Sequence, residues 1–141
     1  TIPITGILIV TTPQDIAMNV AVKAIGMFNK LNVPIIGVVE NMSYLLCPHC
    51  NEQVYLFGHG GGKKISDDFK IPFIGEIPLH PQIMEGSDAG KPTVVSEPES
   101  VQSHAFTKAA KVIAGRISII AAEMQAQEQA EATASEQAKK E

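Results

Sequence analysis

The chain has 141 residues, of which 45% are hydrophobic and 18% charged, and its formal net charge is −4. That length suffices for one domain with a hydrophobic core. A chain without a basic stripe is unsuited to nucleic acid, and no apolar run reaches the ~20 residues of a membrane span. Because no signal peptide is visible either, we expect a cytoplasmic protein that binds neither nucleic acid nor membrane.

The first elements predict a strand, a helix and a second strand. Gly6–Thr11 and Ile35–Val39 are short apolar runs rich in branched residues, which is typical of buried strands. Between them, Thr12 is favoured as the cap of a helix, with Pro13 at its first position and Asp15 completing a capping-box-like pattern. Apolar residues recur at helical spacing along it, namely Ile16, Val20, Ala24, Met27 and Leu31. Such a unit implies two parallel strands.

The middle of the chain predicts an excursion, a short helix and a third strand. Tyr44–Phe57 has apolar groups at both ends, which suggests a β-hairpin-like flap. Three glycines then open a helix over Lys63–Phe69, and Pro72–Ile77 reads as a strand. We expect an α/β fold, a parallel sheet with flanking helices.

The rest of the chain predicts a loop, a helix and a tail. A polar loop follows Pro78–Pro81 and runs to Pro98, and a helix begins at Ser100. That helix carries apolar residues on or near one face, namely Val101, Ala105, Ala109, Val112 and Ile120. From Ala121 onward the composition is rich in Ala, Gln and Glu, which indicates a frayed helix or disorder. We therefore divide the chain into a domain over 1–120 and a tail over 121–141.

Two cysteines, Cys47 and Cys50, stand in the motif Cys-Pro-His-Cys within the predicted flap. Two thiolates cannot complete a four-coordinate zinc or iron–sulfur site. The residues leave three interpretations open. The pair is half of a site that a second copy of the chain completes, or it forms a zinc site with histidines of the same chain, or it is a thioredoxin-like redox centre. The candidate histidines are His49, His59, His80 and His104.

The redox interpretation is the weakest of the three, because the residues after Cys50 alternate polar and apolar and no helix follows. Gly58–Lys64 is rich in glycine and lysine but does not have the G-x-x-x-x-G-K-[ST] spacing of a phosphate-binding loop. We interpret it as a hinge followed by the start of a helix.

Several residues follow the predicted parallel strands directly. Asn41 follows the second strand, Pro78 and Leu79 follow the third, and Thr12 follows the first. Ligands of open α/β sheets bind at the carboxyl ends of the strands. Position alone leaves Asn41 open between a ligand contact and a turn residue.

Six short motifs together resemble one family. In chain order they are TTPQD (Thr11–Asp15), ENMS (Glu40–Ser43), CPHC (Cys47–Cys50), FGHGGG (Phe57–Gly62), GEIPL (Gly75–Leu79) and D-x-G-x-P (Asp88–Pro92). The chain resembles the carboxy-terminal half of an Mrp/ApbC-type ATPase over roughly residues 1–120. These ATPases are cytosolic iron–sulfur cluster carriers related to the MinD group of P-loop NTPases.

The resemblance implies a homodimer that binds ATP with Mg²⁺ and carries a [4Fe–4S] cluster to recipient apoproteins. It implies that Cys47 and Cys50 are cluster ligands, shared with the same pair of a second subunit. It further implies that Asn41 reads the adenine edge, that Pro78 and Leu79 line the base pocket, and that Thr12 belongs to a segment near the nucleotide.

The family's phosphate loop and Mg²⁺-binding aspartate have no counterpart in these residues, so we expect this chain to lack ATPase activity. Two further functions stay open on the sequence, namely a structural zinc-binding module and a MinD-type regulatory ATPase.

Overall fold

The computed structural model describes residues 4–47, 49–50 and 52–138. Expectations that fall on Thr1–Pro3, Pro48, Asn51 and residues 139–141 lie outside this range. Three strands form a parallel sheet in the order β1-β2-β5, with bounds Ile7–Thr11, Ile35–Asn41 and Phe73–Ile77. The predicted parallel pair and the third strand are thus confirmed, and β2 is the central strand.

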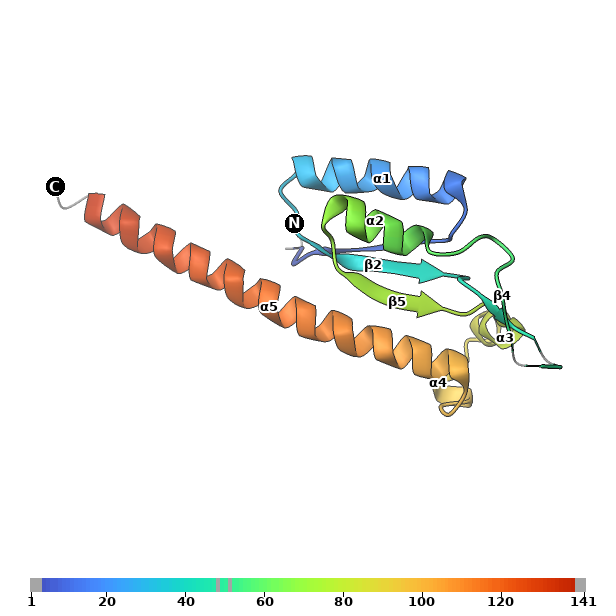
Figure 1. Cartoon of the computed structure of the whole chain (residues 1–141). Coiled ribbons are helices and arrows are strands. Elements are labelled where there is room, and N and C mark those ends of the chain that lie inside the picture. Colours follow the sequence, from blue (N-terminus) through green and yellow to red (C-terminus); the bar gives the residue numbers. More distant parts are fainter. Residues whose placement is uncertain (1–3, 48, 51, 139–141) are drawn as a thin grey trace.

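Helices cover both faces of this sheet (Figure 1). The helices α1 (Asp15–Lys30) and α2 (Gly61–Phe69) lie on one face, and α5 (Val101–Ala138) lies on the other. Because side chains alternate along a strand, β2 supplies both cores. Val38 packs with Ile25 and Ile65 on the α1/α2 side, and Val39 packs with Ala109 on the α5 side. This arrangement confirms the predicted α/β class.

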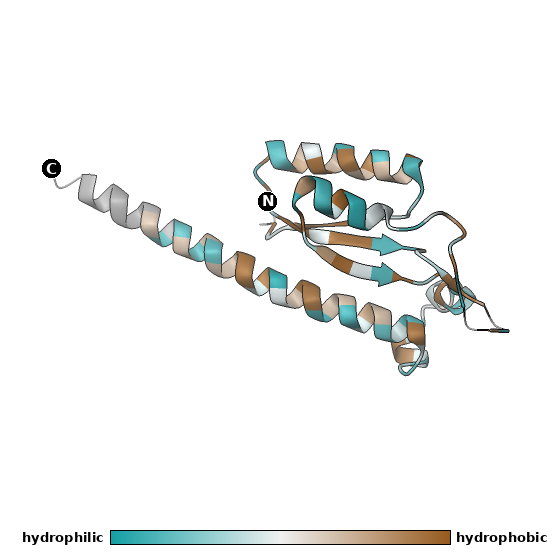
Figure 2. Cartoon of the chain, in the orientation of Figure 1, coloured by the Kyte–Doolittle hydropathy of each residue, from teal (hydrophilic) through white to brown (hydrophobic). Residues whose placement is uncertain are grey.

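The helix α1 forms where its apolar spacing predicts, but most of the stripe that predicted it faces outward. Ile16 is 79% exposed and Val20 64%, whereas Ala21 and Ile25 are buried. Both sets recur at helical spacing, so the helix carries two apolar faces and only one of them meets the sheet. The apolar bands along α1 are visible in Figure 2.

The predicted cap of α1 is wrong. The helix begins at Asp15, its cap position is Gln14, and no side chain caps it. The Thr12 hydroxyl instead donates to Oε1 of Gln14 at 2.5 Å. Thr12 therefore lies outside the cap position of this helix.

The predicted polar loop after the third strand is also wrong in part, because it contains two short helices, α3 (Pro81–Asp88) and α4 (Thr93–Ser96). His80 caps α3 by accepting from the amide of Gln82 at 3.3 Å, and Pro81 occupies the first turn. Proline has a helical φ and lacks an amide that the first turn would leave without a partner. The cap and the proline therefore favour a helix here, although the apolar pattern of the segment is weak.

The predicted hairpin is confirmed. Its strands β3 (Leu45–Leu46) and β4 (Gln53–Val54) pair antiparallel, with Leu45 opposite Val54. The hairpin projects from the carboxyl end of the sheet, near α3 (Figure 1). At the other extreme of the chain, α5 continues as one helix to Ala138 and extends past the sheet. Within the described residues, no helix has both the length and the apolarity to cross a membrane.

The same substitution, isoleucine to alanine, should change stability by different amounts on the two faces of α1. Ile25→Ala should lower the free energy of unfolding by ~2–5 kcal/mol, because it opens a cavity in the core. Ile16→Ala should change it by no more than ~0.5 kcal/mol. Urea unfolding followed by circular dichroism measures both values, and equal losses would show that the exposed face of α1 is packed in solution.

Candidate functional site

The carboxyl ends of the three parallel strands meet at one edge of the sheet. Thr11 pairs with Glu40, and Glu40 in turn pairs with Glu76. One residue further, Asn41 pairs with Ile77. The residues singled out after each strand therefore converge on this edge, as parallel pairing requires.

Asn41 lies between two cavities at this edge. A cavity of about 150 Å³ is lined by Asn41, Pro78 and Leu79, together with residues of α3. A larger one of about 560 Å³ runs along β1 and α1 and is lined by both Thr12 and Asn41. The four residues expected to contact a nucleotide are thus gathered around Asn41. Its Oδ1 accepts from the amide of Met42 at 3.0 Å, which fixes the orientation of the side chain.

The two thiols lie at the tip of the hairpin. The amide of Cys47 donates to the carbonyl of Glu52 at 2.9 Å, which closes the turn. Cys47 is half-buried and Cys50 is exposed, and both are free thiols. The backbone hydrogen bonds of His49 and Cys50, with a further one from the Cys50 side chain, hold the pKa of the Cys47 thiol below its usual range. A lowered pKa favours the thiolate, which is the form that binds metal.

Among the histidines considered as zinc ligands, His49 lies in the turn between the two cysteines and is exposed, but among the described residues it forms no group with both sulfurs within 4.8 Å. His80 caps α3, and His104 on α5 faces Glu99 at 3.8 Å. In the described part of the chain, one group of three potential ligand side chains lies within 4.8 Å, namely Glu40, His59 and Glu76, and it contains neither cysteine. The strand β4 follows Cys50, where a thioredoxin-like centre would have a helix. Both alternatives within a single chain therefore find no support in this geometry.

Glu40 was not singled out from the sequence, yet it is fully buried at the centre of this edge. Its Oε1 accepts from the Ser43 hydroxyl at 2.6 Å and from the amide of Gly60 at 3.4 Å, and its Oε2 accepts from the amide of Gly62 at 2.5 Å. The one signal in the sequence is an acidic residue at the end of an otherwise apolar strand, which requires buried donors.

Tyr44 links the root of the hairpin to β5. Its carbonyl accepts from the amide of Leu79 at 2.7 Å, and its ring lines a cavity of about 290 Å³ together with Glu76. Burial, then the negative charge of Glu76 and the neighbouring Tyr55, raise the pKa of the Tyr44 hydroxyl. The hairpin and the carboxyl edge of the sheet are thus in direct contact.

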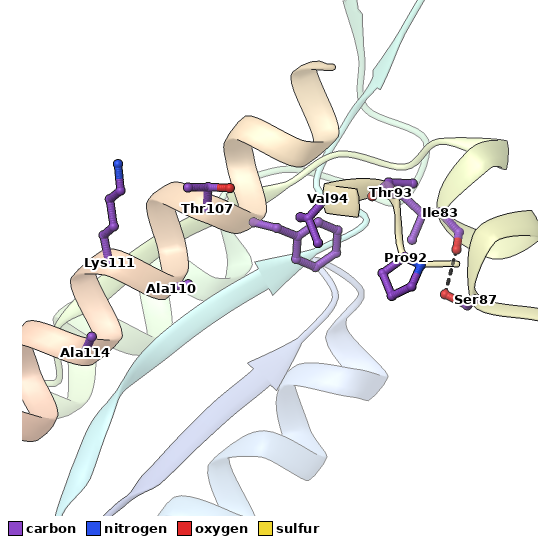
Figure 3. A pocket seen from close by; sticks show the side chains of 10 residues that line it. Ile83, Ser87, Pro92, Thr93, Val94, Thr107, Ala110, Lys111 and Ala114 are labelled. Atoms are coloured by element: carbon purple, nitrogen blue, oxygen red, sulfur yellow. Dashed lines mark hydrogen bonds between the residues drawn. The ribbon is translucent and has the colours of Figure 1, made fainter. Parts of the chain in front are cut away.

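A cavity larger than those at the sheet edge lies elsewhere. It measures about 710 Å³ and lies between α3, α4 and α5, where Ile83, Pro92, Val94 and Ala110 line it (Figure 3). Its walls are mostly apolar, and Lys111 supplies the one charged side chain among the residues that line it. Because the sheet edge gathers more polar groups and both sulfurs lie on the adjoining hairpin, we place the candidate site at that edge.

Known proteins of one family resemble this chain in sequence. Residues 1–114 match the family described as "ParA: NUBPL iron-transfer P-loop NTPase". The chain is 46% identical to the "Iron-sulfur cluster transfer protein NUBPL" of Dictyostelium discoideum over 84% of its own length and 37% of the relative's. It is 44% identical to the "Iron-sulfur cluster carrier protein" of Deinococcus radiodurans over 84% of its length and 33% of the relative's. The chain thus spans about a third of the length of these relatives.

Solved structures show the same fold. An ADP complex of a nucleotide-binding protein from Archaeoglobus fulgidus superposes with a TM-score of 0.57 at 41% identity, over 68% of this chain and 38% of that one. The cell division ATPase MinD of Pyrococcus furiosus gives a TM-score of 0.58 at 27% identity, over 77% of this chain and 41% of that one. The expected likeness to MinD-type P-loop NTPases is thereby confirmed.

The environment of Tyr44 predicts a late titration. The chain has two tyrosines, so Tyr55→Phe leaves Tyr44 as the single phenol. Burial and the charge of Glu76 disfavour the phenolate, so Tyr44 should ionise above the ordinary value of about 10. Ultraviolet absorbance during an alkaline titration measures this pKa.

The sign of the effect on stability follows. Because the folded-state pKa is raised, the stability contributed by neutral Tyr44 is complete below pH ~10 and is lost as pH rises through the folded value. Ionisation of Tyr44 at or below the ordinary value would contradict the burial of its hydroxyl and the influence of the nearby charge of Glu76.

Proposed function

Because this chain belongs to the NUBPL iron-transfer family of P-loop NTPases, we propose that it carries an iron–sulfur cluster on Cys47 and Cys50 and delivers it to recipient apoproteins. The observation that supports this most directly is the placement of both sulfurs at the tip of a projecting hairpin. The carboxylate of Glu52 lies 3.7 Å from Sγ of Cys50, but within the described residues no third potential ligand forms a group with both sulfurs within 4.8 Å. A donor set of two thiols suits a site that is shared and exposed.

The shortage of ligands supports a symmetric dimer. A [4Fe–4S] cluster takes four thiolates, and one chain supplies two. A two-fold axis through the hairpin tip would present the same pair from each subunit, since an isologous interface brings identical patches together. Two hairpins would then hold one cluster between them.

Exposure of the ligands supports delivery over permanent storage. Cys50 is exposed and Cys47 is half-buried, so the thiolates of a recipient could approach the irons directly. Each exchange would break one bond from iron to a carrier sulfur and form one to a recipient sulfur, with no net oxidation. The cluster is therefore cargo, and its lability is part of the function.

The sheet edge supports binding of a nucleotide base beside Asn41. Pro78 and Leu79 supply apolar contacts, and Thr12 lies on the other side of Asn41. The Archaeoglobus relative is an ADP complex. The 141 residues contain no phosphate-binding loop of the G-x-x-x-x-G-K-[ST] type, and phosphate and Mg²⁺ contacts dominate in such sites. These residues alone should therefore bind ADP or ATP weakly.

Anaerobic reconstitution with iron and sulfide tests the cluster site. The unaltered chain should become brown and hold about four irons per dimer. Cys47→Ser with Cys50→Ser should abolish iron binding, because no thiolate remains. His49→Ala is the matched control at the same hairpin and should keep the iron content. Full iron content in the double variant would refute the assignment, and a colourless protein with one zinc per monomer would favour a structural zinc module.

Nuclear magnetic resonance with millimolar ADP tests the nucleotide edge, since this method detects weak binding. ADP should shift the amide resonances of Asn41 and Leu79 while leaving that of the exposed residue Glu123 on α5 unchanged. Asn41→Ala should reduce these shifts, because the side-chain amide that reads the base is gone. Shifts confined to other parts of the chain would place the nucleotide elsewhere.

A further inference from the structure

Glu40 is an acidic residue at a buried position of β2, where the other buried side chains are apolar. The preceding residues of β2, Val38 and Val39, are buried among apolar neighbours, and Glu40 itself is 0% exposed. Burying a carboxylate is costly unless hydrogen bonds replace its water. Three donors do so here, namely the Ser43 hydroxyl and the amides of Gly60 and Gly62.

These donors come from both ends of the segment that carries the thiols. Ser43 directly precedes the hairpin, and Gly60 and Gly62 follow it at the start of α2. A single carboxylate thus joins the entry and the exit of the excursion to the end of β2. Because the amide of Gly62 belongs to the first turn of α2, the positive end of that helix also faces the carboxylate.

The approach of α2 to Glu40 depends on the absence of a side chain at Gly62. A Cβ at that position would lie 2.9 Å from Cβ of Glu40 and 3.2 Å from its Oε2. Both distances are shorter than ordinary contacts, so alanine there would push the carboxylate away. The glycine at position 62 is therefore matched to the acid at the end of β2.

Further contacts fix each root of the hairpin. At the entry, the amide of Ser43 donates to the carbonyl of Ile77 at 3.0 Å. At the exit, the ring of His59 contacts the ring of Tyr55, with their centroids 4.3 Å apart. The hairpin is thus held at its base, while Cys50 at its tip is exposed.

The neighbouring group of Glu40, His59 and Glu76 has the composition of a cation site, with its ligand atoms within 4.8 Å of one another. However, both oxygens of Glu40 already accept from donors that point at them. A cation would compete with these donors, so we interpret Glu40 as an anchor for the hairpin and not as a metal ligand.

We propose that Glu40 is a positioning residue of the thiol-bearing hairpin, an inference that rests on the proposed cluster-carrying function. Its carboxylate fixes the two ends of the hairpin relative to the sheet. The pair of sulfurs is thereby presented in one orientation, as a two-fold partner must meet it. Without this anchor the sheet remains, but the hairpin moves at its base and the shared cluster is lost faster.

The test compares Glu40→Met, which removes both acceptors at similar length, with Glu85→Met, the same change at an exposed position. Amide hydrogen exchange is measured on the metal-free chain. In Glu40→Met, the amides of Ser43 and Gly62 should exchange about tenfold faster or more, while those of Val38 and Val39 keep their protection. Glu85→Met should change neither set.

Two more variants separate the charge from the geometry. Glu40→Gln keeps one oxygen acceptor, so the amide of Gly62 should recover much of its protection. Gly62→Ala keeps the carboxylate but displaces it, so it should resemble Glu40→Met. If Glu40→Met does not fold, Ser43→Ala cuts only the entry contact and should raise exchange there alone.

The functional arm measures how fast a ferrous chelator removes iron from the reconstituted protein. Removal should be several-fold faster in Glu40→Met and unchanged in Glu85→Met. Two results would overturn the proposal, namely an equal loss of protection in the hairpin roots and the sheet, or unchanged iron removal. Failure of the unaltered chain to take up iron would refute the proposed function instead, and the exchange measurement would still test the anchor.

Discussion

Glu40 places a buried carboxylate beneath the first turn of α2, where backbone amides and a hydroxyl replace its water. This contact sets the distance between the central strand and the start of that helix. It also determines where the chain leaves the sheet to form the hairpin and where it returns. Removing the carboxylate would leave buried donors without an acceptor, and removing the donors would leave a buried charge. Either change should destabilise the fold more than the loss of a contact on the surface.

The parallel register explains why the two candidate sites are neighbours. Glu40 and Asn41 are consecutive, so their side chains point to opposite faces of the same strand end. The side chain of Glu40 contacts both ends of the hairpin segment, and Asn41 lies between the two cavities at the carboxyl edge of the sheet. The amide of Leu79, which lines the smaller cavity, also donates to the root of the hairpin at Tyr44. A change at either site therefore has a short path of direct contacts to the other.

The sequence predicted the three parallel strands and the helices α1, α2 and α5, because short apolar runs and helical apolar spacing determine these elements, whereas α3 and α4 have only a weak pattern. It could not choose between the two apolar faces of α1, since spacing is the same for the set with Ile16 and the set with Ile25. The prediction that Thr12 caps α1 failed because the helix begins at Asp15, which makes Gln14 and not Thr12 the cap residue. The contacts of Glu40 with Gly60 and Gly62 join residues that are about 20 positions apart, and no local pattern reveals such a pairing.

The strand β1 ends the sheet among the described strands, and apolar side chains of β1 and α1 beside it, such as Val10 and Val20, remain exposed. Its outer row of peptide groups has no ladder partner, and an uncovered edge of this kind recruits further strands. Concentrated samples of this chain should therefore self-associate by sheet extension. In size-exclusion chromatography, such association would look like the pairing of subunits around iron, although it involves the β1 edge and not the tip of the hairpin, and needs no thiol.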